Sequence, residues 1–187
     1  MGTILNLAPI TTLTRQQFYQ LCLANPDVPM ERSPTGDLII MTPIGGEGSN
    51  QEAHLILKVG IWNEGTGLGM VFSSQTVFSL PGGGDRSPDV AWVRLERWQK
   101  LGQEDREGFP PICPDFVIEL RSRSDRLKPL QDKMREYLAC GLQLGWLINR
   151  QDQRVEIYRA GQAVEVVAMP ISLSGEAVLP GFVLEVR

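Results

Sequence analysis

Two carboxylates, Asp89 in SPDVAWV and Glu119 in DFVIELR, stand in apolar segments whose composition predicts β-strands. Strand side chains alternate between faces, so Glu119 and Arg121 share one face, and Asp89 lies where its strand begins, after Pro88. An ionised carboxylate among apolar neighbours is costly unless a cation offsets its charge. If the two strands are neighbours, Asp89 and Glu119 can converge on one hard cation. Mg²⁺ typically takes one or two protein carboxylates together with water and substrate phosphate, so the pattern predicts a Mg²⁺ site, with Mn²⁺ as the alternative metal.

Two basic residues are placed to assist such a site. Arg121 follows Glu119 by two positions, and Lys133 lies on the helix predicted after that strand. A nearby cation can orient the attacking water and neutralise charge that develops on the phosphoryl oxygens. Arginine is effectively never deprotonated, whereas the pKa of a lysine can be moved. We therefore favour Lys133 as the catalytic cation and keep Arg121 as the alternative.

Each of these residues also has a purely structural interpretation. Asp89 can hydrogen-bond local backbone at a strand start. Glu119 can form an ion pair with Arg121 or Arg123, and Lys133 can be an ordinary solvated lysine on a helix flank. Asp115, which follows Pro114, is interpreted as a structural residue at a strand start. The residues alone leave these alternatives open.

Several other kinds of site are disfavoured. The three cysteines are far apart and show no CxxC pairing, which argues against a zinc knuckle or a disulfide framework. His54 is the single histidine, and we interpret it as a surface or boundary residue rather than a catalytic base. The segment PGGGDRS lacks the Gly-Lys-Ser/Thr ending of a phosphate-binding loop, so its glycines most simply form a turn.

Length and composition indicate one domain spanning residues 1–187. A chain of 187 residues with 42% hydrophobic content can build one substantial core. It contains no run of about 18 apolar residues and no positively charged leader, so we expect a cytoplasmic protein with no membrane segment. The net charge of −4 argues mildly against a nucleic-acid coat protein. Residues 121–135 nevertheless hold six basic residues against two acidic ones, next to the candidate site.

The predicted elements place the candidate residues in an α/β domain. Helical spacing and breakers predict helices over about 15–24, from after Gly46 to before Gly65, around 95–101 and over 128–140. Residues 31–43 are typical of a hairpin. Further strands are predicted over 70–73, 76–80, 88–93, 115–121, 144–149, 155–158, 164–168 and 182–186, the last as an edge strand.

Asp89 in SPDVAWV, the triplet Glu119-Leu120-Arg121 and the segment QDKMREYLACGLQLGWLIN resemble the PD-(D/E)xK nuclease superfamily. They more closely resemble the Uma-two family of putative restriction endonucleases. The resemblance runs from ERSPTGDLIIMTP through PDFVIELRSRSD to LPGFVLEV. It implies a restriction-endonuclease-like α/β fold, with a mixed central β-sheet flanked by helices, an extra N-terminal hairpin and extra C-terminal strands. It also implies metal-dependent cleavage of DNA.

The resemblance carries one departure and two further expectations. Arg121 stands where the motif has its lysine, and Lys133 would supply that lysine from the next helix. Glu47, just before the second helix, resembles the extra acidic residue that some of these nucleases place near the metal. Analogy with nucleases of this fold suggests a homodimer.

Two alternatives to a nuclease remain at this stage, because a fold does not fix a function. One is a catalytically inactive nuclease-fold protein that binds nucleic acid or a protein partner through residues 121–135. The other is an interaction domain with no nucleic-acid role.

Overall fold

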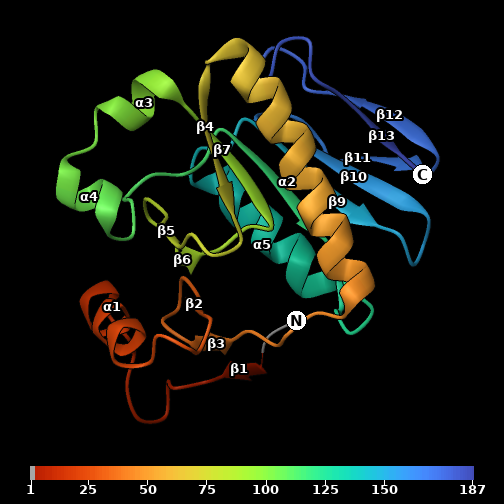
Figure 1. Cartoon of the computed structure of the whole chain (residues 1–187). Helices are drawn as coiled ribbons and strands as arrows, with labels where there is room; N and C mark the ends of the chain where they lie inside the picture. The colour runs from red at the N-terminus through yellow and green to blue at the C-terminus, as the bar shows by residue number, and fades with distance from the viewer. Residues whose placement is uncertain (1–2) are drawn as a thin grey trace.

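A computed structural model describes residues 3–187, and a six-stranded mixed sheet forms its centre (Figure 1). The strands lie in the order β11-β10-β9-β8-β7-β4, with bounds β4 Gly69–Ser73, β7 Val90–Arg94, β8 Phe116–Leu120, β9 Leu144–Asn149, β10 Arg154–Arg159 and β11 Glu165–Ala168. Only β8 and β9 pair in parallel, and the other neighbours in this sheet are antiparallel.

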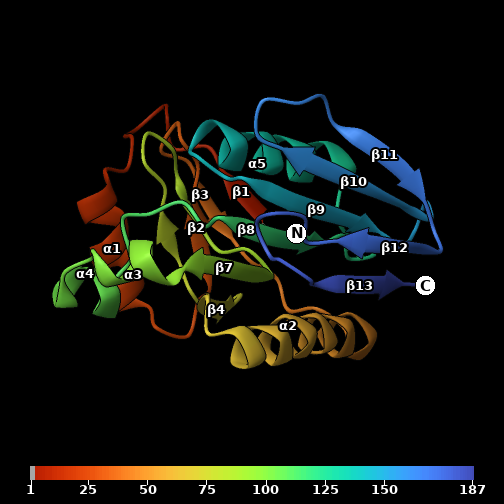
Figure 2. The same cartoon turned by 90° about the horizontal axis from the view of Figure 1, so that it is seen from above.

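Helices cover both faces of this sheet (Figure 2). The helix α5 (Leu127–Ala139) connects the parallel strands β8 and β9, as parallel pairing requires a crossover connection, and lies on one face. The long helix α2 (Gly46–Thr66) lies on the opposite face, beside the two-stranded sheet of β12 (Ile171–Ser174) and β13 (Val183–Val186). The predicted α/β class, with a mixed sheet between helices, is confirmed.

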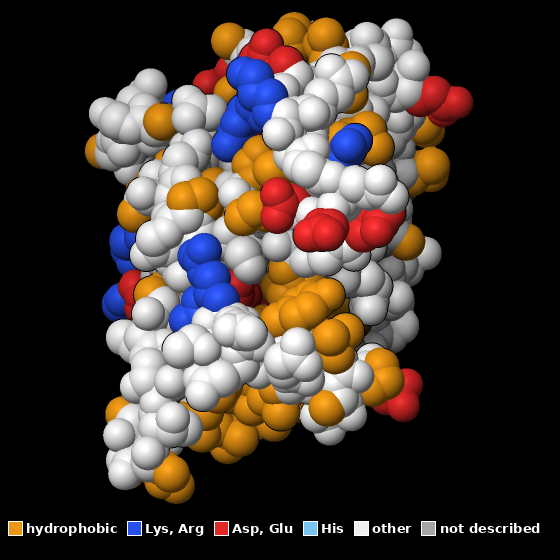
Figure 3. Space-filling view, turned by 90° about the vertical axis from the view of Figure 1, so that its left-hand side faces the viewer, with side chains coloured by type: hydrophobic (Ala, Val, Ile, Leu, Met, Phe, Trp, Pro, Cys, Tyr) orange, Lys and Arg blue, Asp and Glu red, His pale blue; other side chains and the backbone are white. Residues whose placement is uncertain are grey.

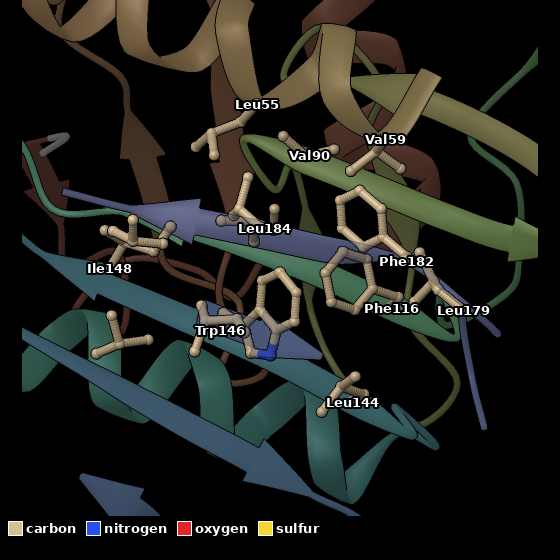
Figure 4. Close-up of a cluster of buried hydrophobic side chains, with 14 of the residues drawn as sticks. Leu55, Val59, Val90, Phe116, Leu144, Trp146, Ile148, Leu179, Phe182 and Leu184 are labelled. Atoms are coloured by element: carbon tan, nitrogen blue, oxygen red, sulfur yellow. The ribbon is translucent and has the colours of Figure 1, made fainter. Parts of the chain in front are cut away.

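The face under α2 carries an apolar core (Figure 4). Strand alternation sends Phe116 and Ile118 of β8 and Trp146 of β9 to this side, where they meet Leu55 and Val59 of α2. The rings of Phe116 and Trp146 meet edge to face with centroids 4.8 Å apart. The intervening residues point to the α5 side, and Glu119 is one of them.

A second, smaller sheet is built from N-terminal strands and the segment before β7. Its order is β1-β3-β2-β6-β5, with bounds β1 Thr3–Leu5, β2 Met30–Arg32, β3 Leu38–Ile40, β5 Phe78–Ser79 and β6 Asp85–Arg86. Helix α1 (Arg15–Ala24) packs Phe18 against Met30 and Leu38. It begins at a capping box in which Thr14 and Gln17 satisfy each other's backbone N–H groups. This sheet supplies one residue of the site described below.

The predicted elements are close to most of those observed, but the short strands β1, β6 and β12 were not predicted. Helix α2 continues past Gly65 to Thr66, and its C-cap Gly67 has a φ of +64°, the left-handed stop that glycine favours. Besides α3 (Leu95–Gln99), the polar segment after it forms a short helix, α4 (Gln103–Glu107). The edge strand predicted over 182–186 pairs with β12 in a separate two-stranded sheet.

Within residues 3–187, no helix is both long and apolar enough to cross a bilayer.

Candidate functional site

Asp89 and Glu119 lie together at one edge of the central sheet. Strands β7 and β8 are antiparallel neighbours with Val90 opposite Ile118, so the same register sets Asp89 beside Glu119. The Asp89 carboxylate accepts the Leu120 backbone N–H at 2.6 Å, which ties it to the end of β8. The structure thus brings the two predicted carboxylates to neighbouring strand positions, on the side of the sheet that faces α5.

Lys133 reaches the same place from α5. Its Nζ lies 2.8 Å from Glu119 Oε1 and 2.8 Å from Glu31 Oε1, and it donates a hydrogen bond to the Ser87 carbonyl at 3.0 Å. One turn further along α5, the Tyr137 hydroxyl donates to the same Glu119 oxygen at 3.0 Å. The Lys133 side chain is only 8% exposed, so three oxygens replace the water that its ammonium loses.

Glu31 is a site residue that the sequence did not reveal. It projects from β2 and accepts hydrogen bonds from the Ser87 backbone N–H at 2.9 Å and from Arg86 at 3.0 Å, in addition to its ion pair with Lys133. Arg86 in turn pairs with Glu136 of α5 at 2.6 Å. The sequence offered no signal for Glu31, because the strand Met30–Arg32 has only three residues and is too short to show a period.

The three carboxylates of the cluster have pKa values that are shifted in different directions by their surroundings. Burial and the nearby Glu119 charge raise the pKa of Asp89 well above the usual range. Burial also raises the pKa of Glu119, and Lys133 opposes that change only in part. Burial would raise the pKa of Glu31 as well, but Lys133 and Arg86 outweigh it and hold that pKa below its usual value.

Lys133 is a fixed ammonium rather than a base. Burial alone would lower its pKa, but the carboxylates of Glu119, Glu31 and Asp89 raise it above the usual lysine value. It therefore carries a positive charge near neutral pH and cannot accept a proton from water.

The donor set of the cluster fits a hard cation. Asp89 is partly exposed, and within residues 3–187 it forms no ion pair closer than 4 Å. The negative charges of Glu119 and of Glu52 of α2 disfavour the ionised form of Asp89, and a divalent ion would offset that repulsion. No three acidic, histidine or cysteine side chains of the described chain converge in a metal-binding group. Two carboxylate ligands with water and phosphate completing the shell is an arrangement that Mg²⁺ accepts.

The structure places Arg121 and Glu47 away from this cluster. Strand β8 ends at Leu120, so alternation no longer governs Arg121, and its guanidinium turns to Asp152 at 2.9 Å and the Asn149 side chain at 3.1 Å. Glu47 is exposed in the first turn of α2, where its carboxylate accepts a hydrogen bond from Gln51.

Asp115 is held by structural contacts. Its carboxylate accepts the Arg94 backbone N–H at 2.8 Å and pairs with Arg97 at 2.8 Å. These bonds fix the loop before β8.

The basic segment 121–135 is partly neutralised within the protein. Arg121 pairs with Asp152, both Lys128 and Arg135 pair with Asp132, and Lys133 is buried in the cluster. These contacts involve four of the six basic residues, so they reduce the positive charge that the segment offers to an external anion without removing it.

Two comparisons with known proteins found a match, one to a family and one to a fold. The model of the Uma2 family, described as putative restriction endonuclease, matches residues 15–187. A solved structure titled a putative nuclease belonging to DUF820, from Anabaena variabilis, is similar with 22% sequence identity and a TM-score of 0.73, over 89% of this chain and 90% of that one. At this identity the likeness shows the fold. No curated protein gives a significant match.

Proposed function

The chain belongs to the Uma2 family of putative restriction endonucleases, and from that premise we propose that it hydrolyses DNA phosphodiester bonds as a Mg²⁺-dependent endonuclease. One observation carries the proposal. A carboxylate without a cationic partner, Asp89, lies beside the Glu119–Lys133 pair at the edge of the sheet. The carboxylate of Asp89 can bind a metal ion, and the ammonium of Lys133 beside it can contact a phosphate.

In this proposal Asp89 and Glu119 hold the metal. Mg²⁺, or Mn²⁺ in its place, supplies Lewis-acid stabilisation of phosphoryl charge and lowers the pKa of bound water when it is present. Because Tyr137 and Lys133 both bind the same Glu119 oxygen, Oε1, they fix the orientation of that carboxylate. The bond from the Leu120 N–H fixes Asp89 in the same way.

Lys133 supplies the fixed positive charge of the site. Its ammonium lies 2.8 Å from Glu119 and its pKa is raised by the surrounding carboxylates, which suits stabilisation of the negative charge that grows on the phosphoryl oxygens better than the role of general base. This is the role that a lysine on the strand would have had, and Arg121 does not reach the cluster. Glu31 acts as a positioning residue, because it binds the same Lys133 ammonium that Glu119 binds, each at 2.8 Å.

A homodimer forms a further part of the proposal. Two copies related by a two-fold axis would present one site to each strand of a duplex. Size-exclusion chromatography with light scattering, with and without duplex DNA, tests this point, and a monomer under both conditions would contradict it.

Plasmid nicking tests the proposed activity. Wild-type protein is expected to nick supercoiled plasmid with Mg²⁺ or Mn²⁺ and to stop when EDTA is added. Asp89→Asn and Glu119→Gln should each lower the rate by at least about 100-fold while circular dichroism shows an unchanged fold.

Asp152→Asn is the matched control, since it neutralises an acidic residue outside the cluster and should leave nicking intact. Cleavage by the folded wild-type protein in the absence of metal would overturn the proposal. Normal cleavage by the Asp89→Asn variant would overturn it as well.

A further inference from the structure

A groove of about 470 Å³ lies between α2 and β13, on the face of the sheet opposite α5. Basic side chains from three separate parts of the chain line it. Its lining residues are His54, Lys58, Arg150, Val183, Leu184, Glu185 and Arg187. His54 and Lys58 stand four positions apart on α2, so the helix presents both on one side.

The cations of this groove have no acidic partners. Lys58, Arg150 and Arg187 are exposed, and within residues 3–187 none of them forms an ion pair shorter than 4 Å. Glu185 is the one acidic residue of the lining. The groove thus differs from the segment 121–135, in which Arg121, Lys128 and Arg135 each form an ion pair with an aspartate of the protein. Unpaired like charges in one groove repel each other, and an external anion relieves that repulsion.

The groove lies near the candidate metal site. Arg150 comes directly after Asn149, the last residue of β9. On the neighbouring parallel strand, Glu119 stands opposite Leu147. Arg150 is therefore three residues beyond that position, roughly 10 Å along the strand direction at the usual rise of about 3.3 Å per residue, and its groove lies on the other face of the sheet. A polyanion that places one phosphodiester at Asp89 and continues around this end of the sheet would bring its neighbouring phosphates to the groove.

We propose that the groove binds the sugar-phosphate backbone of the DNA substrate, a few nucleotides from the bond that is cut. The inference rests on the proposed nuclease function and adds the surface that holds the substrate. DNA carries about one charge per 1.7 Å of duplex length, so several phosphates face a surface of this size. Contacts of this kind set the register of the protein on DNA and carry no sequence preference of their own.

Fluorescence anisotropy with a labelled duplex in EDTA tests the groove, because binding is then measured without cleavage. The test variant is Lys58→Ala/Arg150→Ala in the full chain. The matched control is Lys100→Ala/Arg106→Ala, which removes two exposed cations near α3 and α4, on the far side of the molecule from β13 (Figure 1). The side that carries α1 and α4 shows basic and acidic side chains among apolar and neutral ones (Figure 3).

The groove variant is expected to bind DNA about 10-fold more weakly or worse, and to reduce the slope of log affinity against log salt by about two. The control variant should match wild type. Equal affinity and equal slope for the groove variant and wild type would overturn the inference, and so would a wild-type protein that does not bind DNA. A groove variant that loses binding, in a protein that shows no cleavage with any metal, would keep the groove and refute the nuclease activity instead.

Discussion

The two faces of the central sheet are stabilised in different ways. Under α2, aromatic and aliphatic side chains such as Phe116 and Trp146 pack with each other. Under α5, apolar side chains such as Met134 and Leu147 form a second core, and beside it Glu119 joins an ion network with Lys133 of α5 and Glu31 of β2. Replacing a buried ion network by apolar residues is often neutral or stabilising, so folding alone does not require these charges. The charges that distinguish the α5 face are those to which the proposed function assigns the chemistry.

The sharpest way to break this comparison is Lys133→Met. It leaves Glu31 and Glu119 buried without their shared cation, and should lower the free energy of unfolding by about 3–5 kcal/mol. Nicking should be lost as well, under conditions in which the variant is still folded. Urea denaturation followed by tryptophan fluorescence measures the stability. Lys128→Met, an exposed position on the same helix, should change it by less than about 0.5 kcal/mol. Equal stability of the two variants would contradict the role of Lys133.

Leu144→Ala probes the opposite face. Leu144 is fully buried in the apolar core under α2, so its truncation should lower the free energy of unfolding by about 2–4 kcal/mol. Because Leu144 is neither a residue of the proposed metal site nor a lining residue of the groove, the nicking rate of the folded fraction should stay within about twofold of wild type. A large loss of rate at full folding would show that the two faces are not separate in function.

Glu31→Gln tests whether charge on the α5 face makes stability depend on pH. The pKa of Glu31 is lowered in the folded protein, so its charge stabilises the fold above the unfolded pKa, and that contribution is lost as the pH falls through the folded pKa. The variant should be less stable than wild type by about 2 kcal/mol at pH 7. The gap should shrink steadily below about pH 4. Urea titrations at several pH values measure it, and a gap that does not change with pH would refute the pairing.

Arg121→Ala should have the smallest effect. Its partner Asp152 is 53% exposed, and such a pair contributes at most about 1 kcal/mol. Nicking should stay within about threefold of wild type, because Arg121 does not reach the cluster. If Arg121→Ala abolished nicking while Lys133→Ala did not, the assignment of the fixed cation would be reversed.

Local patterns in the sequence predicted most of the fold and part of the site. Strand alternation placed Glu119 on a defined face, and the helix predicted over 128–140 carries Lys133, as α5 does in the structure. The helix predicted over about 15–24 is α1, Arg15–Ala24. These features depend on neighbours within a few positions, which a sequence displays directly.

The missed parts depend on contacts between distant segments. Glu31 meets Arg86 at a separation of 55 residues, and no periodicity links two such short strands. Arg121 was assigned to the face of Glu119 on the assumption that the strand continued, but β8 ends one residue earlier. Strand ends are set by tertiary pairing, and a single residue decides which way a side chain turns.

The position of Glu31 also has a consequence for the order of folding. Strand β8, helix α5 and strands β9 and β10 follow one another in the chain, so their contacts close short loops and can form early. The bonds from Glu31 to Arg86 and Lys133 close much longer loops and form only when the N-terminal sheet docks. A folding intermediate that lacks this docking would already contain Asp89, Glu119 and Lys133, yet leave the lysine unanchored on one side. Full activity would then be the last property that the newly made chain acquires, after its main hydrophobic core is complete.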